Sequence, residues 1–172
     1  MKILIFGQAG SGKSHYAEER LSALTGQPKI YAAMSPVVDD EMRQRVMRHR
    51  AMRAGRGFVT VEREGDLSGC EEIPAGSSVM IESLTAWTAN VMFADGVKCR
   101  AEVVREIWGD LVGLLGRVRD VVIVADDVFS GGECEGLTEE YVRALAELAV
   151  RIGGIADEVT EVVAGVCVRY KP

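Results

Sequence analysis

The sequence predicts an α/β fold of three layers, in which helices cover both faces of a mainly parallel sheet. Apolar runs at 3–6 and 121–124 are typical of strands that are buried on both faces. Helical patterns separate the apolar runs, and this alternation indicates parallel strands joined by crossover helices. A glycine-rich turn also links the first expected strand to the first expected helix.

The amino-terminal part predicts a strand, a helix and a second strand. The run 3–6 ends at a glycine, which marks the end of the first strand. Segment 14–24 has a helical pattern, and Gly26 and Pro28 beyond it are residues that stop a helix. We expect the second strand at 29–33.

The middle of the chain predicts two more helices and two more strands. A helix is expected over 39–54, because it opens with three acidic residues and a helix amino terminus favours negative charge. Segment 58–61 predicts a short strand. The apolar residues of 77–81 predict a strand that leads into Glu82, and a helix is expected over 84–93.

The carboxyl-terminal part continues the alternation. Segment 101–118 carries apolar residues at helical spacing, and the buried strand 121–124 is ended by two aspartates. Thr138 precedes two glutamates, so it predicts the amino-terminal cap of a helix that runs to about residue 152. The valine-rich segment 158–168 contains one glycine and predicts the last strands.

Composition restricts the class of protein. A chain of 172 residues, spanning 1–172, is expected to form one domain with its own core. The net charge of −6 and the pI near 5.1 argue against broad nucleic-acid binding. The four cysteines show no spacing typical of zinc ligands, which favours reduced thiols and a cytoplasmic protein. No apolar run is long enough to predict a membrane span.

The turn after the first strand carries the most specific motif. Residues 7–14 fit the pattern G-x-x-x-x-G-K-[ST], in which backbone N–H groups and a helix amino terminus bind phosphate. The motif lies between a buried strand and a helix, which predicts a P-loop NTPase (RecA-like) fold. We expect nucleotide contacts from Gly7, Gln8, Ala9, Gly10, Ser11, Gly12, Lys13 and Ser14.

The roles of the last two motif residues follow from their chemistry. Lys13 is expected to act in catalysis by reaching the β- and γ-phosphates, and the Ser14 hydroxyl to bind Mg²⁺. Such an enzyme also needs an acidic residue at the end of a neighbouring strand, near the metal. Glu82 is one candidate, and Asp126 or Asp127 is the other.

A basic segment surrounds one of the two histidines. In the expected helix 39–54, Arg45, His49 and Arg53 share one stripe at four-residue spacing. Guanidinium groups beside an imidazole suit a polyphosphate, and a neutral imidazole can attack phosphorus. From these residues alone a solvated basic helix is the stronger interpretation, and His15 is expected to be exposed.

These motifs together resemble the bifunctional adenosylcobinamide kinase/adenosylcobinamide-phosphate guanylyltransferase family of cobalamin biosynthesis. The resemblance covers most of the chain and is densest from 1 to 93. It rests on Gly7–Ser14 with Ala17-Glu18, Tyr31-Ala32-Ala33, Asp40-Glu41-Met42, Arg45-Val46, His49-Arg50, Arg53, Thr60-Val61-Glu62, Glu82-Ser83-Leu84-Thr85 with Trp87 and Asn90, Ala156-Asp157-Glu158-Val159 and Val162-Val163-Ala164-Gly165.

The resemblance implies a function and a set of site residues. Members phosphorylate adenosylcobinamide with ATP or GTP, and then transfer GMP from GTP to adenosylcobinamide phosphate through a guanylylated histidine, which falls on His49. They use Mg²⁺ and assemble as homotrimers, so a homo-oligomer is implied. Further nucleotide contacts map to Ala33, Met34, Ser35, Arg50, Ala51, Met52, Arg53, Glu62 and Glu82, and Ser14 and Glu82 map to the metal.

The chain departs from the family pattern after the strand 121–124. The family's Asn-Glu-Val-Gly reads Asp126-Asp127-Val128-Phe129, a Val-Pro-x-Asn segment is missing, and the helix after it differs in sequence. The P-loop arginine of the family is Gly10 here. Three alternatives therefore stay open: a member with one activity or another acceptor, a non-catalytic GTP sensor, and a different small-molecule kinase, which would leave His49 unexplained.

Overall fold

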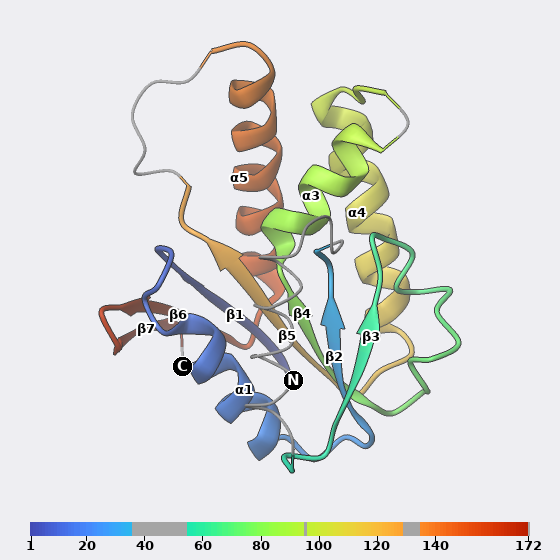
Figure 1. Ribbon diagram of the computed structural model, residues 1–172, viewed down its shortest axis with the longest axis vertical. Coiled ribbons are helices and arrows are strands. Elements are labelled where there is room, and N and C mark those ends of the chain that lie inside the picture. The colour runs from blue at the N-terminus through green and yellow to red at the C-terminus, as the bar shows by residue number, and fades with distance from the viewer. Residues whose placement is uncertain (36–54, 95, 129–134, 172) are drawn as a thin grey trace.

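The computed structural model describes residues 1–35, 55–94, 96–128 and 135–171. Seven strands of the described chain form one sheet in the order β3-β2-β4-β5-β1-β6-β7 (Figure 1). Every neighbouring pair is parallel except β6 and β7. The strands are β1 (Lys2–Gly7), β2 (Lys29–Ala33), β3 (Phe58–Glu62), β4 (Ser78–Glu82), β5 (Asp120–Asp126), β6 (Glu158–Val163) and β7 (Val166–Lys171), and the helices are α1 (Lys13–Ala23), α3 (Leu84–Phe93), α4 (Arg100–Leu115) and α5 (Leu137–Ile155).

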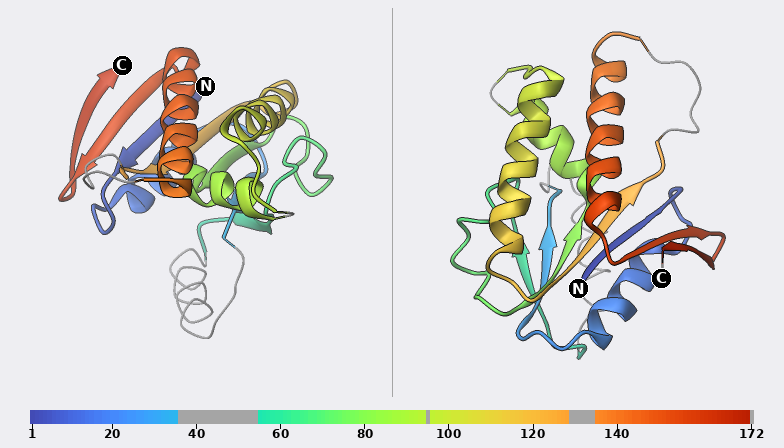
Figure 2. Two further views of the ribbon diagram at one scale, coloured as in Figure 1. Left: turned by 90° about the horizontal axis from the view of Figure 1, so that it is seen from above. Right: turned by 180° about the vertical axis from the view of Figure 1, so that it is seen from behind.

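The helices cover both faces of the sheet, as the three-layer prediction requires. Figure 2 shows α1 against one face and α3, α4 and α5 against the other. Successive strand residues point to opposite faces, and in β1 Ile3 and Ile5 join the core under α1, whereas Leu4 joins the core under the three other helices. The inner strands are therefore apolar on both faces, which explains the unbroken apolar runs in the sequence.

The start of α5 and the end of α4 differ from those expected. The prediction that Thr138 caps α5 is wrong, because α5 begins at Leu137 and its cap is Gly136, with a φ of 64° that glycine adopts readily. Helix α4 ends at Leu115 rather than at 118 and is capped by Gly116, and beyond the cap the guanidinium of Arg117 donates hydrogen bonds to backbone carbonyls. Its acceptors are the carbonyls of Ser68, Cys70 and Ile73. The expected helix 39–54 lies outside the described residues.

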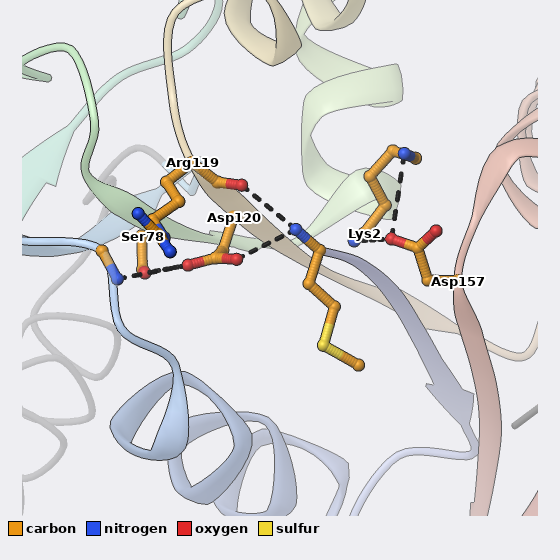
Figure 3. Close-up of polar contacts among 7 residues, drawn as sticks. Lys2, Ser78, Arg119, Asp120 and Asp157 are labelled. Atoms are coloured by element: carbon orange, nitrogen blue, oxygen red, sulfur yellow. Dashed lines mark hydrogen bonds and ion pairs between the residues drawn. The ribbon is translucent and has the colours of Figure 1, made fainter.

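The amino-terminal ends of the central strands are tied together by Asp120. Its Oδ1 accepts a hydrogen bond from the Met1 ammonium at 2.9 Å, and its Oδ2 accepts one from the Ser78 hydroxyl at 2.7 Å. A second contact lies beside it, where Asp157 accepts from the backbone N–H of Lys2 at 2.6 Å (Figure 3). Side-chain hydrogen bonds therefore connect the strands at their amino-terminal ends. The loops that form ligand sites in such sheets lie at the opposite side, beyond the carboxyl ends of the parallel strands.

Lys29 secures the carboxyl-terminal end of α1. Its buried ammonium donates to the carbonyls of Leu21, Ser22 and Leu24 at 2.7, 2.5 and 2.6 Å. These are carbonyls that a helix end leaves without intrahelical partners, and a cation is favoured there. Burial lowers the pKa of Lys29, and the charge of Asp120 opposes that effect. The carboxyl-terminal end of α1 is thus held by a buried charge.

Candidate nucleotide-binding site

The turn between β1 and α1 has the backbone geometry that the motif predicts. Gly10 and Gly12 adopt φ values of 73° and 94°, a region that residues with a Cβ rarely enter. Gly7 is required for a different reason, because a Cβ there would lie 2.4 Å from the carbonyl oxygen of Val162 in β6. Gly12 also precedes the first turn of α1, so the free N–H groups of that helix point toward the turn.

Lys13 lies over this turn and is held from two sides. Its ammonium donates to the carbonyl of Gln8 at 3.2 Å and lies 2.7 Å from Oδ1 of Asp126. The Lys13 side chain is 8% exposed, whereas that of Asp126 is 36% exposed. Asp126 therefore places a carboxylate against the lysine that the motif assigns to phosphate.

Ser14 and Glu82 meet at the same edge of the sheet. The Ser14 hydroxyl donates to Oε1 of Glu82 at 2.9 Å. Oε2 of Glu82 is buried, and it has no hydrogen-bond partner within the described part of the chain; the same holds for Oγ of Ser11. Unsatisfied buried polar atoms are rare and indicate a missing partner. Hydroxyl and carboxylate oxygens are the hard donors that Mg²⁺ prefers, so these residues fit such an ion.

The sheet order corrects one detail of the sequence interpretation. Glu82 ends β4, which is not next to β1, because β5 lies between the two strands. The direct neighbour is β5, whose Asp126 lies opposite Gly7 in the register. The two candidate acids therefore occupy different positions and both contact the P-loop segment. Glu82 contacts Ser14, and Asp126 contacts Lys13.

The surroundings of Glu82 change its acidity. Burial raises the pKa of Glu82 to about 7, against the lowering effects of the Ser14 hydrogen bond and the Lys13 charge. The charges of Asp126 and Glu18 raise it further. A carboxylate shifted this far toward neutrality is costly to keep ionised, and a nearby cation would relieve that cost.

Four other predicted contact residues lie at the ends of β2 and β3 or just beyond β2. In the register Ala33 pairs with Glu62 on one side and with Glu82 on the other, so strands β3, β2 and β4 end together. Met34 follows directly, and its N–H donates to the carbonyl of Glu82 at 2.8 Å. Ser35 is exposed beyond it. Of this row of paired residues, Glu82 contacts the P-loop segment directly, through Ser14.

The remaining predicted residues divide into two groups. His49, Arg50, Ala51, Met52 and Arg53 lie outside the described residues, so their predicted roles stay predictions. His15 is exposed, and its Nε2 lies 3.3 Å from Oε1 of Glu19 one turn along α1, which confirms the expectation that it is exposed.

Sequence reasoning missed two supporting residues. Thr85 Oγ1 accepts the N–H of Asp126 at 2.9 Å, and the Thr85 carbonyl accepts from the Tyr141 hydroxyl at 3.0 Å. Burial, followed by the Asp126 charge, raises the pKa of Tyr141 to about 12. Thr85 belongs to the Glu-Ser-Leu-Thr run noticed in the sequence, but nothing in the sequence links Tyr141 of α5 to this site.

Comparison with known proteins supports this description of the fold. A prototypical ATPase from the type III secretion system of pathogenic bacteria superposes with a TM-score of 0.53 at 14% identity. The match covers 93% of this chain and 51% of that chain, so the protein spans about half of that neighbour. The P-loop NTPase fold predicted from the sequence is thus confirmed. None of the helices in the described ranges is long and apolar enough to cross a membrane.

Relatives in sequence identify the family. The bifunctional adenosylcobalamin biosynthesis protein CobP of Pseudomonas aeruginosa is 33% identical over 169 residues, covering 96% of this chain and 94% of the relative. The bifunctional adenosylcobalamin biosynthesis protein CobU of Salmonella typhimurium is 31% identical over 186 residues, covering 99% and 100%. The family described as cobinamide kinase / cobinamide phosphate guanyltransferase matches residues 3–170. This chain therefore belongs to the cobinamide kinase / cobinamide phosphate guanyltransferase family.

Proposed function

We propose that this chain phosphorylates adenosylcobinamide with ATP or GTP, and transfers GMP from GTP to adenosylcobinamide phosphate, giving adenosylcobinamide-GDP. The observation that carries the proposal is the meeting of Lys13, Ser14 and Glu82 around a glycine turn, in a chain that matches the family from 3 to 170. Relatives named as bifunctional match over nearly their whole length, which supports both activities in one chain.

The turn supplies the binding of the nucleotide. Backbone N–H groups of 8–14 and the amino terminus of α1 face the phosphates, and the Lys13 ammonium neutralises their terminal charge. Ser14 and Glu82 are the residues that would hold Mg²⁺, through the hydroxyl and the buried Oε2. When bound, the ion supplies positive charge to phosphate oxygens. Ala33, Met34, Ser35 and Glu62 are proposed as further nucleotide contacts, which the resemblance to the family and the pairing of Ala33 with Glu82 support.

His49 carries the guanylyl transfer in this proposal. A neutral imidazole attacks the α-phosphorus, pyrophosphate leaves, and the resulting guanylylated histidine passes GMP to the corrinoid phosphate. Arg50 to Arg53 would lie against the transferred group and balance its charge. The support for these roles is the resemblance of the His-Arg segment to the family.

The test is the intact mass of the protein after incubation with GTP and Mg²⁺. We expect one acid-labile GMP adduct on the parent protein and none on His49→Asn, which keeps a side chain of similar size. Adenosylcobinamide phosphate added afterwards should discharge the adduct. An adduct that forms equally on His49→Asn would show that another residue is the nucleophile.

A member with one activity, or with another acceptor, is the second candidate. It is favoured by the altered segment after β5, where Asp126 and Asp127 replace the family's Asn-Glu and α5 begins with a different sequence. The incubation distinguishes it: turnover of ATP with adenosylcobinamide but no GMP adduct would indicate a kinase alone. GTP binding with neither turnover nor adduct would indicate a sensor.

We also propose that the chain forms a homotrimer, as the resemblance implies. The edge strand β7 supports an oligomer, because its side chains are exposed and three of them, Val166, Val168 and Tyr170, alternate as an apolar row. Light scattering should give three times the 18.6 kDa chain mass, and a monomeric mass would contradict the proposal.

The three described cysteines are free thiols, which supports the expected cytoplasmic location.

A further inference from the structure

Asp126 and Glu82 both place a carboxylate against the P-loop segment. Oδ1 of Asp126 lies 2.7 Å from the Lys13 ammonium. Oε1 of Glu82 accepts the Ser14 hydroxyl at 2.9 Å. Burial raises the pKa of Glu82 to about 7, and the charge of Asp126 is among the causes that raise it further, so the two carboxylates act on each other. When both acids are ionised, the single positive charge of Lys13 therefore faces two negative ones.

The backbone, rather than the carboxylate, holds Asp126 in place. Its N–H donates to Thr85 Oγ1 at 2.9 Å, and Asp126 lies opposite Gly7 in the pairing of β5 with β1. The next N–H, that of Asp127, donates to the carbonyl of Gly7 at 2.9 Å. These contacts use the main chain, so they remain when the side chain at position 126 is changed. The negative charge beside Lys13 can thus be removed without disturbing the end of β5.

The charge of Asp126 also sets this chain apart from its family. The family pattern has asparagine at this position, and it has an arginine in the P-loop where this chain has Gly10. One difference adds a negative charge to the phosphate site and the other removes a positive charge. The site of this chain is therefore more negative than the family pattern by two charges.

A more negative site distinguishes between two forms of the nucleotide. The Mg²⁺ complex of a nucleoside triphosphate carries less negative charge than the free triphosphate, because the ion neutralises part of the phosphate charge. Like charges repel, so Asp126 opposes the free form more strongly than the complex. Binding must also draw Lys13 away from Asp126, but that cost is the same for both forms. The difference between the two forms therefore comes from the repulsion.

We propose that Asp126 makes this chain selective for the magnesium complex of its nucleotide over the free nucleotide. The inference rests on the nucleotide-binding part of the proposed function and on neither transfer step. In the nucleotide-free protein Asp126 holds the Lys13 ammonium, and its carboxylate stays at the end of β5 when the ammonium turns to the phosphates. The free triphosphate is excluded by this carboxylate, whereas Ser14 and Glu82 favour the magnesium complex.

The test is calorimetric titration of GTP into the parent and into Asp126→Asn, once in excess Mg²⁺ and once in EDTA at the same ionic strength. Asparagine preserves the size of the side chain and removes its charge. The affinity for free GTP should rise about tenfold in the variant. The affinity for the magnesium complex should rise by no more than about threefold, because the complex is repelled less by the parent.

Two further variants serve as controls. Asp126→Glu keeps the charge and should keep the preference of the parent for the magnesium complex. Asp157→Asn removes one charge at the amino-terminal ends of the strands, where its carboxylate contacts Lys2, and should change neither affinity. Urea unfolding of each variant establishes that the titrated protein is folded.

Each contrary outcome has a definite meaning. Affinity changes in Asp126→Asn that agree within about twofold in the two conditions would overturn the proposal, since Asp126 would then only compete for Lys13. An unchanged or weaker affinity for free GTP would overturn it too, as would loss of the preference in Asp126→Glu. A parent protein that binds GTP in neither condition would overturn the nucleotide-binding part of the proposed function, and the inference with it.

Discussion

Lys13→Met is expected to slow phosphorylation and guanylyl transfer together by about 10³-fold. The ammonium is the described cation placed directly over the P-loop turn, and removing one preorganised charge at a transferring phosphoryl group costs about 10²–10³ in rate. Nucleotide affinity should fall as well, because the same charge binds the ground-state phosphates. Isothermal titration with GTP and single-turnover assays of each step measure the two effects.

The matched control is Lys29→Met, at the other end of α1. Both lysines are buried, but Lys29 donates to carbonyls of the helix end and has no place in the phosphate site. Lys29→Met should lower the midpoint of urea unfolding and leave activity per folded molecule close to that of the parent. If Lys13→Met kept both steps within about tenfold of the parent, the turn would not be the phosphate site.

Glu82→Gln is expected to inactivate the protein while making it more stable at neutral and alkaline pH. Burial raises the pKa of Glu82 to about 7, so the folded state binds its proton more tightly than the unfolded chain does. The protonated Glu82 side chain therefore contributes its full share to the free energy of unfolding below the ordinary pKa of a glutamate. This contribution is lost as the pH rises through 7. Glutamine never ionises and avoids that loss. The variant should gain about 1 kcal/mol at pH 5 and about 3 kcal/mol at pH 8.

Glu158→Gln is the natural comparison, because it neutralises another buried glutamate. Glu158 lies 2.5 Å from the guanidinium of Arg20, so its substitution leaves a cation without its partner and should destabilise the fold. At pH 8, the free energy of unfolding in urea should rise in Glu82→Gln and fall in Glu158→Gln. Such opposite changes would establish that the ionised Glu82 side chain lowers the stability of the fold. A destabilised Glu82→Gln would contradict this account.

Mg²⁺ provides a second measurement on the same variant. We expect Mg²⁺ with GTP to raise the melting temperature of the parent, because the ion relieves the buried negative charge of Glu82. Glu82→Gln should gain less from Mg²⁺, and its phosphorylation rate should fall by about 100-fold or more. An equal thermal shift in both proteins would place the metal elsewhere.

Much of the fold was predictable because local rules govern it. Strands that are buried on both faces need apolar residues at successive positions. The central parts of β1 and β5 could therefore be predicted from unbroken apolar runs in the sequence. The P-loop turn needs glycine at positions with positive φ, and those glycines are visible in the sequence. The cap of α5 was mispredicted, since Thr138 has the right chemistry but Gly136 has the backbone freedom that this turn uses.

The sequence by itself determined the family, the P-loop and the two acids at the ends of strands, because each depends on residue types at short spacing. Only the tertiary structure decided which P-loop residue each of these acids contacts. Strand order is set by crossover connections and burial, which place β5 between β1 and β4. In that order Asp126 forms an ion pair with Lys13, and Glu82 accepts a hydrogen bond from Ser14. It also brings Tyr141 of α5 to Thr85, a contact over 56 positions that no local pattern encodes.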